Sequence, residues 1–299
     1  MPRESLLSLT FGDPGAAPVD LEEHLERGEL VLFPSCPFPL PEGSDREFLL
    51  RQRLGSGFHK NISYDPVTDV LKGHRYQSAA ANRRLADLMA SFSRSVTTWL
   101  HQALPRYAQG CDVDRATLRP AEEALRQLRL RARNDLIHID AFPTRPSHGR
   151  RLLRLYVNIH PTDPRVWATS LLVDQLLERY AGPLGLAEPA RPWSWRWRER
   201  IRQLVGVGQS RGSYDRIMLQ LHNLMKADDE FQERCPKRYW SFPPGSAWLL
   251  FADQLSHAVL RGRFALEHSF FVSRDVLRWP EKSPAALVER WPSAGRRAA

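Results

Sequence analysis

Residues 134–142, NDLIHIDAF, place His138 and Asp140 two positions apart in an otherwise apolar run. In a strand, alternate side chains project from the same face, so these two would lie together while Ile139 points the other way. Burying an aspartate in a strand that is apolar on both faces is costly unless the carboxylate is paired or coordinates something. The pair is therefore either half of a metal site or a histidine and an aspartate that hydrogen-bond to each other.

The spacing alone is weak evidence, because a chain with 10 histidines and this acid content contains about one such pair by chance. A second pair, His24 and Glu26, illustrates the point. It lies in a charged segment with helical character, where residues two apart point about 200° from each other and cannot share a metal ion.

A third residue gives the first pair more weight. His257 begins a second apolar, strand-like segment near the C-terminus. Two histidines and one carboxylate are the ligand set of the non-haem Fe(II) oxygenases, which leaves coordination positions open for a cosubstrate and oxygen. Zinc usually takes four ligands in closed sites, and no cysteine accompanies this set, so the residues favour iron.

An Fe(II) oxygenase that uses 2-oxoglutarate also needs a cation for the far carboxylate of that cosubstrate. Arg154 is the main candidate, because it lies between leucines in the next strand-like segment, where an unpaired arginine is costly. Asn158 on the same face and Asn134 could add hydrogen bonds to the same ligand, whereas Arg261 competes with Arg154 for the role. Each arginine could equally be an exposed strand cation of a basic protein.

The composition is that of one globular domain. The 299 residues are 42% hydrophobic and show no repeat or long linker, so we expect a single domain over 1–299. Lysines and arginines number 43 against 34 acidic residues, and the net charge of +9 favours an anionic partner. Three scattered cysteines indicate neither a disulfide framework nor a thiolate zinc site. With no signal sequence and no run of about 18 apolar residues, the chain is expected in the cytoplasm.

The apolar pattern predicts a mainly β core with flanking helices. Besides 134–142, we expect strands at residues 29–33, 151–161, 245–253, 257–263 and 264–273. Helices are expected at residues 19–27, 45–54, 82–104, 174–184 and 214–235. The C-terminal residues 281–299 have the character of a loosely packed tail.

Four ordered blocks of the chain resemble the Kdo hydroxylases, Fe(II)- and 2-oxoglutarate-dependent dioxygenases that oxidise 3-deoxy-D-manno-oct-2-ulosonic acid (Kdo) on lipopolysaccharide. The blocks are residues 25–40, 138–167, 214–232 and 242–271, so the likeness covers most of the chain. It implies a double-stranded β-helix, or jelly roll, with flanking helices. His138, Asp140 and His257 would hold Fe(II), and Arg154 would bind 2-oxoglutarate.

The reaction that the resemblance implies consumes O2 and 2-oxoglutarate and hydroxylates C3 of Kdo on Kdo-lipid A or a related anionic glycolipid. Succinate and CO2 would be released. Many 2-oxoglutarate enzymes carry an arginine ten or eleven residues after the distal histidine, whereas this chain has Glu267 and His268 there, which favours Arg154 as the anchor. The anionic substrate suits the basic composition, and its carboxylate contacts would come from Arg119, Arg145 and Arg165.

The segment Trp-Ser-Trp-Arg-Trp-Arg at residues 193–198 alternates indoles with polar side chains. It could pack on the core, contact the cytoplasmic face of the inner membrane, or stack on single-stranded nucleic acid. Two other functions therefore stay open: a JmjC-like protein or peptide hydroxylase, and a basic nucleic-acid-binding protein without catalysis. Only charge and this segment support nucleic acid, and no RNP, KH or zinc-finger pattern is present.

Overall fold

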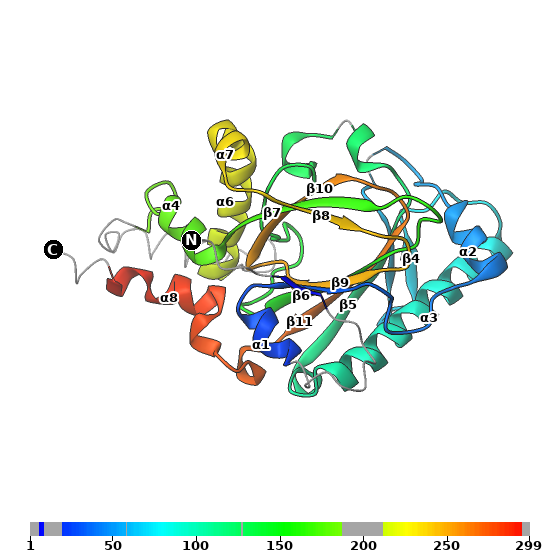
Figure 1. Cartoon of the computed structure of the whole chain (residues 1–299), viewed down its shortest axis with the longest axis horizontal. Coiled ribbons are helices and arrows are strands. Elements are labelled where there is room, and N and C mark those ends of the chain that lie inside the picture. Colours follow the sequence, from blue (N-terminus) through cyan, green and yellow to red (C-terminus); the bar gives the residue numbers. More distant parts are fainter. Residues whose placement is uncertain (1–5, 9–19, 58, 127, 187–211, 295–299) are drawn as a thin grey trace, which may run out of the picture.

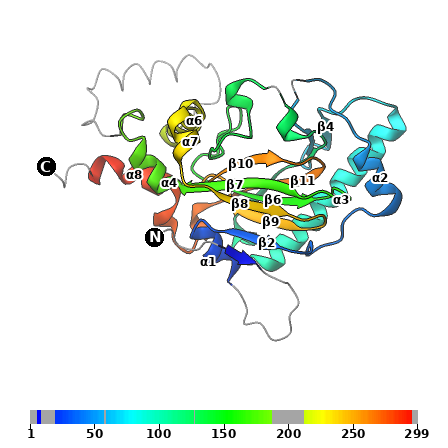
Figure 2. The ribbon, with the colours of Figure 1, turned by 45° about the horizontal axis from the view of Figure 1, so that its top comes forward.

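A computed structural model of the chain describes residues 6–8, 20–57, 59–126, 128–186 and 212–294. Two sheets pack face to face, and helices cover their outer faces (Figures 1 and 2). The larger sheet has the strand order β1-β2-β9-β6-β11-β5-β3-β4, and the smaller one has the order β10-β7-β8. The strands are antiparallel except for the pair β1 and β2, and two such sheets facing each other make the expected jelly-roll core with flanking helices.

The larger sheet consists of β1 (Leu6–Ser8), β2 (Leu30–Phe33), β3 (Ile62–Asp65), β4 (Val70–Lys72), β5 (Cys111–Arg119), β6 (Arg151–Asn158), β9 (Ala247–Phe251) and β11 (Ala265–Val272). The smaller sheet consists of β7 (Arg165–Leu172), β8 (Arg238–Phe242) and β10 (Leu255–Arg261). The helices are α1 (Leu21–Glu26), α2 (Gly43–Leu50), α3 (Ala79–Ala103), α4 (Val173–Arg179), α6 (Ser213–Ala227), α7 (Asp229–Arg234) and α8 (Pro284–Ala294). Short 3-10 turns include η2 (Glu123–Leu125) and η3 (Leu130–Ala132).

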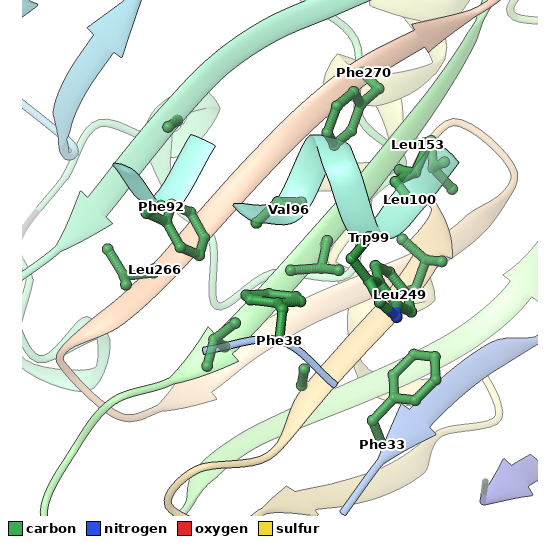
Figure 3. Packing of buried hydrophobic residues seen from close by; sticks show 14 of the residues in the cluster. Phe33, Phe38, Phe92, Val96, Trp99, Leu100, Leu153, Leu249, Leu266 and Phe270 are labelled. Atoms are coloured by element: carbon green, nitrogen blue, oxygen red, sulfur yellow. The ribbon is translucent and has the colours of Figure 1, made fainter. Parts of the chain in front are cut away.

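Helix α3 covers the outer face of the larger sheet. Ser78 caps its first turn by accepting a hydrogen bond from the backbone N–H of Ala81, which satisfies one of the free donors at the helix start. The helix then buries one apolar face (Figure 3). Residues of this outer core include Phe92, Val96, Trp99 and Leu100 of α3 with Leu153, Leu249, Leu266 and Phe270 of the sheet.

The second core lies between the sheets, and it is unusually polar for an interior. All eight residues of β6 are buried, because α3 covers one face and the smaller sheet covers the other. Leu153, Leu155 and Val157 point toward α3, so Arg154 and Tyr156 point inward between the sheets. Polar groups buried in such an interior need partners, so the space between the sheets is where a functional site is expected.

A third core lies on the outer face of the smaller sheet, where α4, α6, α7 and α8 pack together. The expected loose tail over 281–299 is wrong for the residues of α8. Its Ala285 and Val288 are buried against α4 and α6, because the apolar residues of this segment fall on one helical face. Residues 295–299 and the segment 193–198 lie outside the described residues.

A further difference from the sequence prediction is local. The helix expected at 214–235 is divided at Asp228, which leaves the helical conformation and caps α7 by accepting a hydrogen bond from the N–H of Phe231. None of the described helices is both long enough and apolar enough to cross a bilayer.

Candidate metal centre

The segment that carries His138 and Asp140 is extended, but it pairs with β10 through one antiparallel bridge instead of forming the expected strand. His138 and His257 exchange two backbone hydrogen bonds of 3.0 and 2.8 Å. The neighbouring backbone of Ile137 is taken up by Gln232, whose side chain binds both its N–H and its C=O. On either side of the bridge the backbone leaves the regular register, because Asp140 donates to the carbonyl oxygen of Ala252 and Asn134 accepts from Val259, so the ladder does not continue.

His138, Asp140 and His257 are brought together as the sequence predicts. One ligand atom from each lies within 4.8 Å of the others. Nε2 of His138 is 3.6 Å from Oδ1 of Asp140, and Nε2 of His257 is 3.7 Å from Oδ2 of the same residue. The single bridge thus aligns the two histidines, and their Nε2 atoms share one carboxylate.

Backbone carbonyls fix the tautomer of both histidines. Nδ1 of His138 lies 2.7 Å from the carbonyl oxygen of Leu136, and Nδ1 of His257 lies 3.0 Å from that of Leu255. Because a carbonyl only accepts, each Nδ1 carries the hydrogen, and each Nε2 has its lone pair free toward Asp140. This is the arrangement by which proteins orient histidines that bind metals.

Burial and neighbouring charges set the protonation of these three residues. Burial holds the pKa of His138 well below its ordinary value and also lowers the pKa of His257, so both rings are neutral at neutral pH. Burial alone would raise the pKa of Asp140, but the charge of Arg154 at 2.8 Å holds it well below the usual range. Two neutral imidazoles and one carboxylate are the forms that a divalent metal requires.

Asp140 supplies a direct test of whether a metal fits. Its Oδ2 is buried and accepts no hydrogen bond from the described residues, although Nη1 of Arg154 approaches to 2.8 Å. A buried carboxylate oxygen without a hydrogen bond is costly, and a cation between it and the two Nε2 atoms would remove that cost. The residues therefore fit a divalent metal with two nitrogen ligands and one oxygen ligand, and they match the set typical of non-haem iron.

Two residues that the sequence reasoning missed hold the ligand rings in place. His222 of α6 donates from Nδ1 to the carbonyl oxygen of Ile139 at 2.7 Å and meets the ring of His138 edge-on at 5.1 Å. The indole of Trp167 stacks on the ring of His257 at 5.3 Å. His222 could have been suspected from its place on the apolar face of the predicted helix, whereas nothing in the sequence pairs Trp167 with His257.

A network of charges lines the space next to the triad. Nη1 of Arg154 lies 3.2 Å from Oε1 of Glu267, and Nη2 of Arg119 lies 2.6 Å from its Oε2. Arg165 is fully buried, and its Nη1 donates to the carbonyl oxygen of Gly262 at 2.9 Å. Its Nε and Nη2 have no hydrogen-bond partner in the described part of the chain, while Glu123 is 3.9 Å from Nη2. Three of the predicted arginines, Arg119, Arg154 and Arg165, thus lie together between the two sheets.

The remaining predicted residues lie in other environments. Asn158 is buried, and its side-chain amide forms hydrogen bonds with backbone groups. Its Nδ2 donates to the carbonyl oxygens of Asp163 and Phe242, and its Oδ1 accepts from the N–H of His160, so Asn158 stabilises the turn between β6 and β7. Asn134 reaches Glu123 at 3.4 Å, Arg145 pairs with Asp114, and Arg261 is exposed at the end of β10. Their contacts with a cosubstrate or substrate stay predictions.

Comparisons with known proteins identify the family. A family model described as 3-deoxy-D-manno-oct-2-ulosonic acid (Kdo) hydroxylase matches residues 16–294. The chain is similar to solved structures of the Kdo hydroxylase KdoO, a non-heme Fe(II) alphaketoglutarate dependent dioxygenase. No curated protein sequence matches the chain.

The likeness to KdoO extends over nearly the whole of both chains. The apo structure has a TM-score of 0.78 at 34% identity and covers 89% of this chain and 87% of that one. The complex with cobalt(II) has a TM-score of 0.82 at 32% identity, with 96% and 95% covered. The complex with alphaketoglutarate and Fe(III) has a TM-score of 0.80 at 31% identity, with 95% and 94% covered. This chain therefore belongs to the Kdo hydroxylase family.

Proposed function

We propose that this protein is an Fe(II)- and 2-oxoglutarate-dependent dioxygenase that hydroxylates C3 of Kdo on Kdo-lipid A or a related anionic glycolipid. The convergence of two free Nε2 atoms on the Asp140 carboxylate is the observation that carries the proposal. Family membership supports it, and KdoO has been solved with alphaketoglutarate and with succinate, each together with Fe(III). His138, Asp140 and His257 are the proposed iron ligands.

When bound, iron and 2-oxoglutarate supply the oxidising chemistry, in which one oxygen atom of O2 enters the sugar, the other enters succinate, and CO2 is released. The chain's own contribution is to keep the three ligands in their metal-binding protonation states and to hold their rings. Trp167 and Trp248 are fully buried between the sheets, so they keep water from one side of the site. Arg154 and Arg165 are the proposed cations for the carboxylates of 2-oxoglutarate.

Succinate release tests this function. With Fe(II), 2-oxoglutarate, O2 and Kdo-lipid A, we expect succinate to form in step with a product heavier than the substrate by one oxygen atom. Mass spectrometry and NMR of the released sugar should place the new hydroxyl at C3. A substrate whose C3 carries no hydrogen atom is the matched control and should give no product. Succinate that forms equally with and without the glycolipid, or that depends on a peptide instead, would contradict the proposal.

We further infer contact with an anionic membrane surface around the mouth of the site. Leu125 of η2 is 81% exposed and Leu130 of η3 is 45% exposed, and Arg129 and Arg131 beside them are also exposed. Glu123 of the same η2 turn faces the interior arginines, so Leu125 lies close to the site. Exposed leucines among arginines suit a surface of acidic lipid, which is where Kdo-lipid A resides at the cytoplasmic face of the inner membrane.

Vesicle co-sedimentation tests the membrane contact. A double variant Leu125→Ser with Leu130→Ser should bind vesicles that contain phosphatidylglycerol at least about ten-fold more weakly than the parent, because two leucines lose their transfer into the lipid interface. Binding of the parent to vesicles of neutral lipid alone should be weak, because the arginines then lack their anionic partners. Equal binding of parent and variant to anionic vesicles would refute this surface.

A further inference from the structure

A buried carboxylate, Glu123, faces the interior arginines, and the chemistry described so far does not use it. It lies in η2 and is only 5% exposed. Its Oε1 is 3.6 Å from Nη1 of Arg119 and 3.9 Å from Nη2 of Arg165. Nδ2 of Asn134 approaches its Oε2 to 3.4 Å. Three of the residues predicted to bind anionic ligands therefore surround one carboxylate of the chain itself.

The contacts of Glu123 are long for a buried ion pair. Hydrogen bonds between a guanidinium and a carboxylate usually measure about 2.7–2.9 Å. The neighbouring carboxylate of Glu267 follows this rule, because its Oε2 lies 2.6 Å from Nη2 of Arg119. Glu123 stays about an ångström farther from its arginines. It therefore compensates charge between the sheets without using up the hydrogen-bond donors of Arg165.

The separation of Glu123 from Arg165 is fixed by Gly262, to which both are tied. The carbonyl oxygen of Gly262 accepts from Nη1 of Arg165 at 2.9 Å, and its N–H donates to Oε1 of Glu122 at 2.6 Å. Gly262 has a φ of 119°, and a Cβ there would lie 2.9 Å from Cγ of Arg165, so the backbone passes this close only as glycine. The gap between carboxylate and guanidinium therefore closes only if η2 or the turn between β10 and β11 shifts.

This gap leaves Arg165 compensated in charge but with free donors. Burial lowers the pKa of Arg165 to about 10, and Glu123 opposes this shift, so the guanidinium keeps its charge at neutral pH. Its Nε and Nη2 have no hydrogen-bond partner among the described residues. These two nitrogens form one edge of the guanidinium, on which a carboxylate can bind through two parallel hydrogen bonds.

We propose that Glu123 sets how tightly Arg165 holds the far carboxylate of 2-oxoglutarate, and that of succinate after turnover. The inference rests on the proposed function, because it requires that Arg165 receives this carboxylate. In the empty site, Glu123 offsets the charge of the buried guanidinium. Once a ligand carboxylate lies on the edge formed by Nε and Nη2, the nearby oxygen of Glu123 repels it. Part of the attraction of Arg165 is thereby cancelled, which favours the dissociation of succinate.

Glu123→Gln tests the inference, because it removes the charge and keeps the size of the side chain. Dissociation constants are measured by calorimetry on protein loaded with Co(II). The variant should bind 2-oxoglutarate and succinate at least about five-fold more tightly than the parent, because the repulsion is lost. Its affinity for 2-oxopentanoate, which carries a methyl group in place of the far carboxylate, should change by less than about two-fold, since repulsion falls with distance.

Glu122→Gln is the matched control. It removes a charge one residue earlier, from a side chain that accepts hydrogen bonds from the backbone N–H groups of Ala124 and Gly262. All three affinities should stay within about two-fold of the parent, because the glutamine oxygen can still accept these hydrogen bonds.

Thermal unfolding separates this role from a structural one. Without ligand, Glu123→Gln should unfold at a lower temperature than the parent, because Arg119 and Arg165 lose a compensating carboxylate. At equal concentrations of 2-oxoglutarate, the ligand should raise the Tm of the variant by more than that of the parent. Unchanged or weaker binding of 2-oxoglutarate by the variant would overturn the inference. Equal tightening for 2-oxopentanoate, or the same gain in Glu122→Gln, would overturn it as well.

The same measurements distinguish this inference from the proposed function. A parent that binds no 2-oxoglutarate would contradict both. A parent whose 2-oxoglutarate affinity depends on Glu123 as expected, but which releases no succinate with the glycolipid, would contradict the proposed function alone. A parent that binds 2-oxoglutarate and hydroxylates the glycolipid, with no gain in affinity in Glu123→Gln, would contradict the inference alone.

Discussion

His257→Ala is expected to weaken Co(II) binding by more than about 100-fold and to reduce succinate release at least as much, because removing a direct ligand costs more than the 10- to 100-fold typical of a second-sphere partner. Co(II) is the probe because its visible absorption reports coordination. The protein should stay folded, since the imidazole is replaced at one position of a core that also holds Trp167 and Trp248. Circular dichroism and thermal unfolding check this point.

The chain offers a matched control for this variant in its other histidine-acid pair. His24 lies in α1, where its Nδ1 pairs with Glu29 at 2.7 Å, away from the triad. His24→Ala should leave Co(II) affinity and turnover unchanged. Unaltered Co(II) binding by His257→Ala, or an equal loss in both variants, would show that the metal is not held by the proposed triad.

The contrast between these histidines shows how far sequence reasoning reached. Alternation along a strand predicted that His138 and Asp140 would share a face, and helical geometry excluded His24 and Glu26. Both arguments use only local geometry, so they hold even though the segment of His138 makes one bridge instead of a strand. The pairing of His138 with His257 could not be derived from local geometry, because it depends on the fold. In the structure the backbones of the two residues form hydrogen bonds with each other.

What the sequence could not supply are the contacts that depend on three-dimensional packing. Glu267 was noticed as a departure from the common pattern, but its role as a shared partner of Arg119 and Arg154 depends on the register of β11 against its two neighbours. The burial of Lys226 at the end of α6 depends on its contact with η3, which the sequence pattern does not show. The C-terminal helix was missed because its small apolar face becomes useful only against α4 and α6.

The interior charges explain why an anion is needed beside the metal. Three arginines face three carboxylates between the sheets, namely Arg119, Arg154 and Arg165 with Glu123, Asp140 and Glu267. A divalent metal would leave this set with two excess positive charges, and 2-oxoglutarate carries two negative ones. The arginine best able to receive its far carboxylate is Arg165. Its Nε and Nη2 are buried without hydrogen-bond partners among the described residues. In Arg154 only Nε is of this kind, and Nη1 already faces Asp140, Glu267 and Tyr156.

Arg165→Met is therefore expected to raise the KM for 2-oxoglutarate by about 10- to 100-fold, since each charge-assisted hydrogen bond contributes about 1.5–3 kcal/mol. Burial lowers the pKa of Arg165 to about 10, so it is charged at neutral pH and its removal should leave the protein as stable as before, or more so. Arg119→Met is the control with the opposite pattern. This substitution removes the guanidinium whose Nη2 lies 2.6 Å from Oε2 of Glu267 and leaves a buried carboxylate with one partner fewer. It should therefore reduce the free energy of unfolding by about 3–5 kcal/mol.

Arg154→Met separates the two candidate anchors, because Arg154 touches Asp140 and its loss should weaken metal binding as well as turnover. Initial rates at varied 2-oxoglutarate, together with Co(II) titration of each variant, give the two quantities independently. Arg154→Met could raise the KM for 2-oxoglutarate while Co(II) affinity stays constant, and Arg165→Met could change neither quantity. That result would show that Arg154 of β6 binds the distal carboxylate of 2-oxoglutarate. In that case the unpaired nitrogens of Arg165 would bind the substrate carboxylate instead, as the sequence analysis predicts for this residue.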